Sequence, residues 1–254
     1  MSHIVFKFDT PLIESKIIKR PSRECKSPYV ADLLILDENI NTLAHTPALG
    51  CCGLTDNHSN VYVIKKQNSK KCTHSVELSI LSNNILVGCN PKMAEILINN
   101  SLKKNYLNFL KNVNEFTREK KIKNSRFDFY GKDENNIEFV MEVKNVPLAK
   151  MDNNTNKNIS FFPDGYRKSK KEVVSPRALK HIQELEELKL EKKNNIRCIL
   201  CFVIQRNDIH SFMLSENDPI YKEAVIKAKY NGVEIRPVIF EWNTSGEAYY
   251  INEL

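Results

Sequence analysis

Two carboxylates and a lysine stand at spacings that would bring them to one side of a two-stranded sheet. Residues 125–130 and 137–144 alternate apolar and polar side chains, and GKDENN between them has the composition of a turn. Asp128 lies in the first strand, and Glu142 and Lys144 lie in the second. Because alternate side chains of a strand share a face, pairing the apolar faces over a common core would place these three residues together on the opposite face.

Such a cluster is unfavourable unless a cation binds it. Two carboxylates about 4 Å apart repel each other by roughly 1 to 4 kcal/mol. Mg²⁺ and Mn²⁺ prefer hard oxygen ligands, so the sequence predicts one of these metals at Asp128 and Glu142. Lys144 lies about 6 to 7 Å along the same face from Glu142, where its ammonium would orient a water or stabilise charge on a phosphate. The alternative is a surface hairpin with an ion pair, because Glu-x-Lys alone is common.

The wider sequence resembles a known family. Asp followed fourteen residues later by Glu-x-Lys at the end of an apolar strand resembles the PD-(D/E)xK nuclease signature. SRFDF, EVKNVPL, FFPDGY, SPRALKHIQEL and FVIQRND occur in this order and look like motifs of the SfsA (sugar fermentation stimulation protein A) family. AHTPALG and HSVEL, further upstream, look like the N-terminal motifs of that family.

The resemblance implies an α/β protein in two parts. Residues 1–88 would form an OB-like β-barrel that binds nucleic acid, and residues 89–254 a restriction-endonuclease-like mixed sheet flanked by helices. It also implies DNA binding and a nuclease activity. Asp164 in FFPDGY would be a further acidic ligand, although Pro-Asp-Gly is also an ordinary turn. The family name describes a sugar-fermentation phenotype and fixes no reaction.

Basic residues on both sides of the carboxylates are the candidate contacts to a nucleic-acid backbone. Arginine binds phosphate in a bidentate manner, which favours it over lysine at such contacts. The candidates come from the barrel, the first strand, the loop after the hairpin, a helix start and a strand end. They are Lys19, Arg20, Arg23, Arg126, Arg167, Lys168, Arg177, Lys180, Gln205 and Arg206.

Net charge favours a polyanionic partner only modestly. The chain has 254 residues, 38 of them Lys or Arg and 31 Asp or Glu, which gives a net charge of +7. We expect DNA as the partner, with RNA as the alternative, and a homodimer is compatible with the sequence. No apolar run reaches the roughly 18 residues of a membrane span, and MSHIVFKFDT lacks a secretory signal. A cytoplasmic setting, with the nucleus as the alternative, is therefore expected.

Other function classes find less support. Seven cysteines without a secretion signal argue against disulfides. Cys198-x-x-Cys201 has the spacing of half a zinc site, but IRCILCFVI predicts a buried strand in which cysteine acts as a small hydrophobe. A sugar-metabolising enzyme would need a Gly-rich phosphate loop or dinucleotide fingerprint, and the sequence has neither. The rival to a nuclease is a DNA-binding regulator without catalysis, which would not need carboxylates facing a polyanion.

The elements that must hold the site follow from periodicity. Residues 4–87 read as short strands separated by turns, and 91–112 reads as a helix that places Glu95 within reach of the metal. Glu77 in a preceding strand would do the same, and for both Glu95 and Glu77 a surface or hinge position is the favoured interpretation. Further helices are expected over 177–193 and 219–230, the first followed by a buried strand and the second by a last strand. Phe127 and Phe129 are expected on the same apolar face, and residues 150–174 are expected to form a loop over the site.

Overall fold

The N-terminal part is a closed β-barrel. The computed structural model describes residues 3–47, 51, 53–67, 69, 71–165, 172–192 and 195–254. Six strands follow the order β4-β3-β2-β5-β6-β7, and parallel pairing of β4 with β6 closes the barrel. Buried aliphatic side chains such as Ile17, Leu33 and Val63 fill its interior. The strands are β2 (Ile13–Lys19), β3 (Val30–Ile35), β4 (Ile40–His45), β5 (Asn60–Lys65), β6 (His74–Ile80) and β7 (Leu86–Gly88), with the short helix η1 (Ser82–Asn84) before β7.

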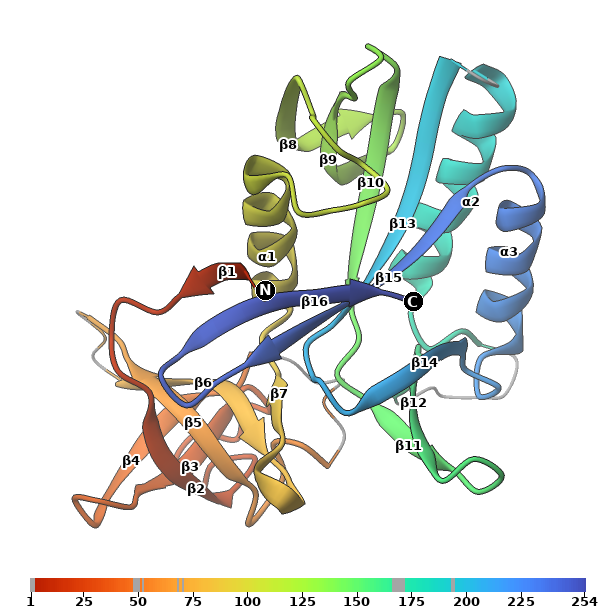
Figure 1. Ribbon diagram of the computed structural model, residues 1–254. Helices are drawn as coiled ribbons and strands as arrows, with labels where there is room; N and C mark the ends of the chain where they lie inside the picture. The colour runs from red at the N-terminus through yellow and green to blue at the C-terminus, as the bar shows by residue number, and fades with distance from the viewer. Residues whose placement is uncertain are drawn as a thin grey trace.

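The second part is a seven-stranded mixed sheet beside the barrel (Figure 1). Its order is β1-β16-β15-β13-β10-β9-β8, in which β10, β13 and β15 run parallel. The middle one of these strands, β13, is buried on both faces from Cys198 to Ile204, as expected for a strand covered by helices. The strands are β1 (His3–Lys7), β8 (Glu115–Ile122), β9 (Ser125–Lys132), β10 (Glu138–Asn145), β13 (Ile196–Ile204), β15 (Glu234–Trp242) and β16 (Glu247–Glu253).

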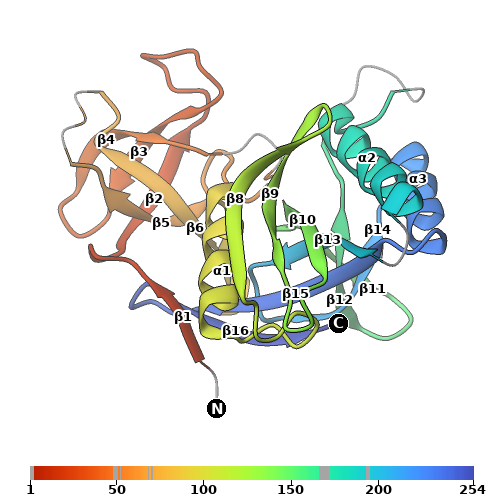
Figure 2. The ribbon, with the colours of Figure 1, turned by 90° about the horizontal axis from the view of Figure 1, so that it is seen from above.

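Helices cover both faces of this sheet (Figure 2). Helix α1 (Pro91–Lys104) packs Leu97 and Ile98 into the core on one face. Helices α2 (Pro176–Lys192) and α3 (Pro219–Tyr230) pack into the core on the other face. The fold is therefore the expected one: an OB-like barrel followed by a restriction-endonuclease-like mixed sheet flanked by helices.

A small third sheet continues the chain after β10. Strands β11 (Ala149–Asp152), β12 (Lys157–Phe162) and β14 (Ile209–Leu214) follow the order β11-β12-β14. Part of the loop expected over 150–174 is therefore strand. The pairing of β12 with β14 holds the end of β12 beside the large sheet.

Two expectations about local structure need correction. The helix expected over 91–112 ends at Lys104, because Asn105 adopts a left-handed conformation with a φ of 62° and caps the helix. Phe127 and Phe129 do not share a face, since Phe127 joins the core under α2 and Phe129 the core under α1. The alternative interpretation, a surface hairpin, does not apply, because β10 lies in the sheet interior between β9 and β13.

The first strand departs from the proposed boundary at residues 88 and 89. β1 pairs antiparallel with β16 at the edge of the large sheet, so residues 3–7 belong structurally to the second part. After β1 the chain thus leaves the large sheet, forms the barrel, and then rejoins the large sheet. The division into 1–88 and 89–254 remains a proposal that this strand does not follow.

The cysteine pair is part of the core, as predicted. Cys198 and Cys201 are fully buried and lie on opposite faces of β13, one in each core. Burial raises the pKa of both thiols. Two thiols on opposite faces of one strand cannot share a metal or form a redox pair with each other.

Among the residues that the structure describes, no helix is both long and apolar enough to cross a membrane.

Candidate active site

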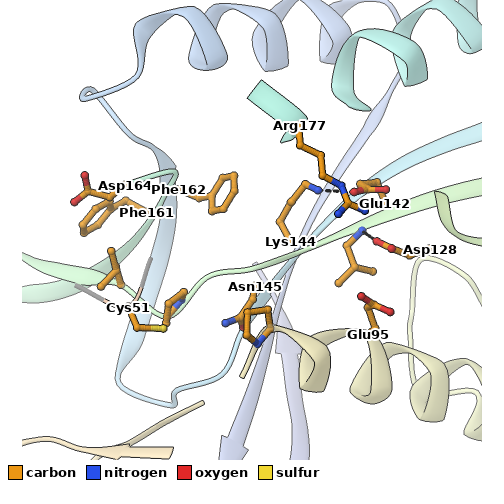
Figure 3. A pocket seen from close by; sticks show the side chains of 14 residues that line it. Cys51, Glu95, Asp128, Glu142, Lys144, Asn145, Phe161, Phe162, Asp164 and Arg177 are labelled. Carbon is orange, nitrogen blue, oxygen red and sulfur yellow. Dashed lines mark hydrogen bonds and ion pairs between the residues drawn. The ribbon is translucent and has the colours of Figure 1, made fainter. Parts of the chain in front are cut away.

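A cavity of about 330 Å³ opens beside the end of β10 (Figure 3). It lies where β9, β10, α1, the start of α2 and the end of β12 approach one another. The cavity brings together all three residues of the predicted carboxylate and lysine cluster. Its lining comprises Cys51, Pro91, Glu95, Asp128, Glu142, Val143, Lys144, Asn145, Pro147, Leu148, Phe161, Phe162, Asp164 and Arg177.

Glu142 is the most constrained acid of the cavity. Its carboxylate is 2% exposed, and Oε1 accepts hydrogen bonds from Lys144 Nζ and from His181 Nδ1. Its Oε2 atom is buried and has no hydrogen-bond partner among the described residues. Burial by itself would raise the pKa of Glu142, but the His181 hydrogen bond and the Lys144 charge hold that pKa below its ordinary value.

Asp128 is held beside Glu142 by an interruption of the sheet. The ladder between β9 and β10 ends at the pair Phe129 and Met141, and one residue further the Asp128 carboxylate accepts the Val143 N–H at 2.7 Å. Burial, followed by the negative charge of Glu142, raises the pKa of Asp128 to about 7. The two acids of one cavity therefore have opposite pKa shifts.

A third carboxylate approaches from the helix. Glu95 of α1 lines the cavity next to Asp128, and its negative charge contributes to the raised pKa of that residue (Figure 3). Arg118 of β8 pairs with Glu95 at 3.0 Å. Glu77, the other candidate acid, is buried outside this lining and accepts a hydrogen bond from Asn90 at 2.8 Å.

Asp164 lines the cavity on the side away from Asp128 and Glu95 (Figure 3). Its Oδ1 accepts the Gly165 N–H at 2.8 Å and the Asn217 amide at 3.4 Å. The first bond belongs to a local turn, and the second joins that turn to the segment before α3. Among the described residues no group of three or more His, Cys, Asp or Glu side chains is arranged to hold a metal ion.

Arg177 is the one described candidate phosphate contact that lines the cavity. Lys180 lies on an outer face, where its ammonium donates to Asn124 O at 3.0 Å, and Arg126 pairs with Glu119 at 3.2 Å. Lys19 and Arg23 are exposed on the barrel, outside this cavity. Arg167 and Lys168 lie outside the described residues.

The side chains of three other candidates, Arg20, Gln205 and Arg206, form hydrogen bonds within the protein. The Arg20 guanidinium donates to Pro28 O at 2.8 Å and to Thr55, so it ties two loops of the barrel together.

Gln205 and Arg206 were expected at a sheet edge facing substrate, and this expectation is wrong. Gln205 is fully buried; it donates to Asn145 at 2.7 Å and accepts from Trp242 at 3.0 Å. The backbone N–H of Gly88 also donates to the Gln205 carbonyl, which anchors the end of the barrel to the sheet. Arg206 is buried in a bidentate pair with Asp208 at 2.7 Å. Both side chains therefore hold the fold together.

Sequence reasoning missed the contact of His181 with Glu142. His181 is buried on α2, on the same stripe as Ala178, Ile182 and Leu185. A polar residue on an apolar helical stripe needs a buried partner, and that signal was present in the sequence. Asn145, one residue beyond Lys144, was also missed as part of the cavity wall.

The fold and this cavity define a two-part protein that joins an OB-like barrel to a restriction-endonuclease-like sheet. The family described as "Sugar fermentation stimulation protein RE domain" matches residues 92–246. A sugar fermentation stimulation protein homolog from Mannheimia succiniciproducens is 31% identical over 231 residues, which cover 89% of this chain and 87% of the relative. A homolog from Crocosphaera subtropica is 31% identical over 252 residues, 96% of this chain and 95% of the relative.

The chain belongs to the sugar fermentation stimulation protein (SfsA) family, which confirms the resemblance found in the sequence. SfsA from Pyrococcus furiosus, solved in complex with Ca²⁺, has the same fold, with a TM-score of 0.81 over 99% of this chain and 98% of that one. The two chains are 20% identical.

Proposed function

We propose that this protein is a metal-dependent nuclease that hydrolyses phosphodiester bonds of nucleic acid, with DNA favoured and RNA as the alternative. The observation that carries the proposal is a pair of carboxylates, the buried Glu142 and the partly buried Asp128, in one cavity with Lys144. Burying two acids together is unfavourable in the absence of a cation, and a protein that only binds DNA gains nothing from it.

The residues fit a divalent cation. The Oε2 atom of Glu142 is a buried acceptor without a hydrogen-bond partner among the described residues, and the pKa of Asp128 is raised to about 7 because burial and the Glu142 charge outweigh the Val143 N–H and the Lys144 charge. We propose Asp128 and Glu142 as ligands of Mg²⁺ or Mn²⁺, with Asp164 as a further acid of the cavity. The Pyrococcus furiosus relative was solved with Ca²⁺, another cation that takes oxygen ligands.

Each side chain has a distinct part in the proposed reaction. A bound divalent cation would polarise the phosphate and lower the pKa of a water. Lys144, held against Glu142 by its ion pair, would stabilise the negative charge that develops on the phosphate. Arg177, exposed at the start of α2, would bind a neighbouring phosphate. His181 would fix the orientation of Glu142 by donating Nδ1–H to its carboxylate.

The remaining basic candidates stay proposals as outer contacts to the nucleic-acid backbone. Lys19 and Arg23 on the barrel and Arg126 and Lys180 beside the cavity are exposed. Such contacts position a strand without selecting its sequence, and they weaken with salt.

A cleavage assay tests the proposal. We expect the purified protein to cut labelled single-stranded or double-stranded DNA or RNA in Mg²⁺ or Mn²⁺, and to lose this activity completely when EDTA removes the metal. The rival function, a DNA-binding regulator without catalysis, predicts salt-dependent retardation of DNA in a gel. Retardation without cleavage in every metal would favour the regulator.

Replacing His181 should weaken metal binding through Glu142. We expect His181→Ala to reduce the affinity for Mg²⁺ or Ca²⁺ by about 10- to 100-fold, because the carboxylate loses the donor that orients it. His181→Asn, whose amide can replace the Nδ1 donor, should restore much of this affinity. Isothermal titration calorimetry measures both, with Glu187→Ala on the exposed side of α2 as the control. Equal affinities for wild type and His181→Ala would contradict this role.

A further inference from the structure

The cavity has two chemically different halves (Figure 3). Asp128, Glu142 and Glu95 lie on one side, and Lys144 lies between them and the other side. That other side is mainly apolar, and metal-dependent hydrolysis makes no use of it. Its lining residues are Pro147, Leu148, Phe161 and Phe162.

The two phenylalanines are fixed in position. Both lie at the end of β12, whose pairing with β14 sets Phe161 opposite Met213. Phe162 packs against the rings of Phe202 and Tyr221, with centroids 5.5 and 5.6 Å away, and still lines the cavity. Phe161 is only partly buried, and its ring has the Lys150 ammonium 5.9 Å from its centroid. An aromatic wall held in this way binds a flat ligand without a large ordering cost.

Polar groups border the apolar half. Asn145 accepts from Gln205 at 2.7 Å through Oδ1, which leaves its amide N–H groups as donors beside the cavity. Asp164 supplies an acceptor on the side of the phenylalanines (Figure 3). A flat apolar ligand with donors and acceptors at its edge matches this arrangement, and a nucleobase is such a ligand.

The position of the apolar half relative to the carboxylates limits the form of the substrate. A base within a duplex is covered on both faces by its neighbours, so it can lie against Phe161 only if it is unpaired or extruded. A cavity of about 330 Å³ is at the lower end of the range for small-molecule sites, which suits a single nucleotide.

We propose that the apolar half binds the unpaired base of a nucleotide whose phosphate lies at the carboxylates. The preferred substrate is therefore single-stranded or locally unpaired nucleic acid, with the base stacked on Phe161 and its edge at Asn145. This inference rests on the proposed nuclease function and names the substrate class of the same site.

A binding assay that needs no cleavage tests the base site. The probe is a single-stranded oligonucleotide, as DNA and as RNA, with one 2-aminopurine, titrated with the protein in Ca²⁺. We expect stacking to change the 2-aminopurine fluorescence on binding, and we expect an oligonucleotide that is abasic at that nucleotide to bind about tenfold more weakly. Phe161→Ala should lower the affinity for the intact strand by about the same factor of ten, and it should not lower the affinity for the abasic strand any further.

Two further variants make the test specific. Phe161→Trp retains an aromatic face and should restore binding of the intact strand. Met151→Ala removes an exposed side chain of the same β11–β12 hairpin outside the cavity and should bind both strands as wild type does. Equal binding of intact and abasic strands by the wild type would overturn the base site.

The outcomes separate this inference from the nuclease proposal. Base-dependent binding without cleavage in Mg²⁺ or Mn²⁺ would support the base site and remove the nuclease. Metal-dependent cleavage of duplex and single strand at equal rates, with no effect of an abasic nucleotide, would support the nuclease and overturn the base site. The DNA and RNA probes identify which sugar the site accepts.

Discussion

We expect Glu142→Gln to lower the proposed metal-dependent cleavage about a thousandfold and to abolish tight binding of Mg²⁺, whereas Lys144→Met should lower cleavage by a similar factor and retain the metal. The difference follows from the cavity. Glu142 supplies a buried negative charge, and its Oε2 atom has no hydrogen-bond partner among the described residues. A cation needs both the charge and the free oxygen. Lys144 donates to the same carboxylate through its ammonium, so its removal takes a positive charge from the reaction and leaves both acids in place.

Two measurements separate these variants. Single-turnover cleavage of a labelled strand gives the loss of rate, and calorimetric titration with Mg²⁺ or Ca²⁺ gives the affinity. Circular dichroism shows whether each variant is folded, which matters because Glu142 is buried. Met151→Ala, with its exposed side chain, serves as the matched control for both assays. Cleavage that survives in both Glu142→Gln and Lys144→Met would place the activity elsewhere or in a contaminant.

We expect Asp128→Asn to stabilise the metal-free protein at alkaline pH. The pKa of Asp128 is about 7 in the folded protein, against an ordinary value of 3.8. A raised pKa means that this group stabilises the fold most fully below pH 3.8, and that the contribution is lost as pH rises through 7. An asparagine at this position is uncharged at every pH, so the variant does not lose this contribution as the pH rises. Between pH 5 and 8, in EDTA, the free energy of unfolding of the variant should therefore rise by about 2 to 3 kcal/mol relative to wild type.

The same variant reports on the metal. Mg²⁺ at a hundred times its dissociation constant should stabilise the wild type by about 2.7 kcal/mol at pH 8 and the variant much less. Urea unfolding at both pH values, with and without Mg²⁺, measures both effects. Glu119→Gln, an exposed acid on neighbouring β8, is the control. If the free energy of unfolding depends on pH in the same way in wild type and Asp128→Asn, the Asp128 carboxyl does not have a raised pKa.

The sequence predicted the fold class and the family because both depend on patterns that are local or are repeated in several blocks. The alternation along 137–144 put Glu142 and Lys144 on one side of a strand, and the structure brings both beside Asp128. The sequence did not correctly predict which face of the sheet each side chain occupies. Phe127 and Phe129 separate into two cores because the β9–β10 ladder stops at Phe129, which strand periodicity does not reveal.

The errors at the end of β13 have a tertiary origin. Gln205 and Arg206 follow a buried strand, and polar residues at that place commonly face solvent or ligand. Their partners come from other parts of the chain: Trp242 lies 37 residues after Gln205, and Pro147, whose carbonyl accepts from Arg206, lies 59 residues before it. No single-sequence pattern predicts such contacts. His181 was the reverse case, since its position on an apolar stripe indicated a buried partner without identifying it.

The place of β1 at the edge of the large sheet makes the barrel an insertion tethered at two points. One connection leaves β1 after Lys7, and the other enters α1 directly after β7, close to the carboxylates. Two attachments restrict swivelling, so a strand lying across the barrel would meet the cavity at a fixed angle. A shortened chain beginning at residue 89 would also uncover the hydrogen-bonding edge of β16, and we expect the remaining part to associate with itself through that edge.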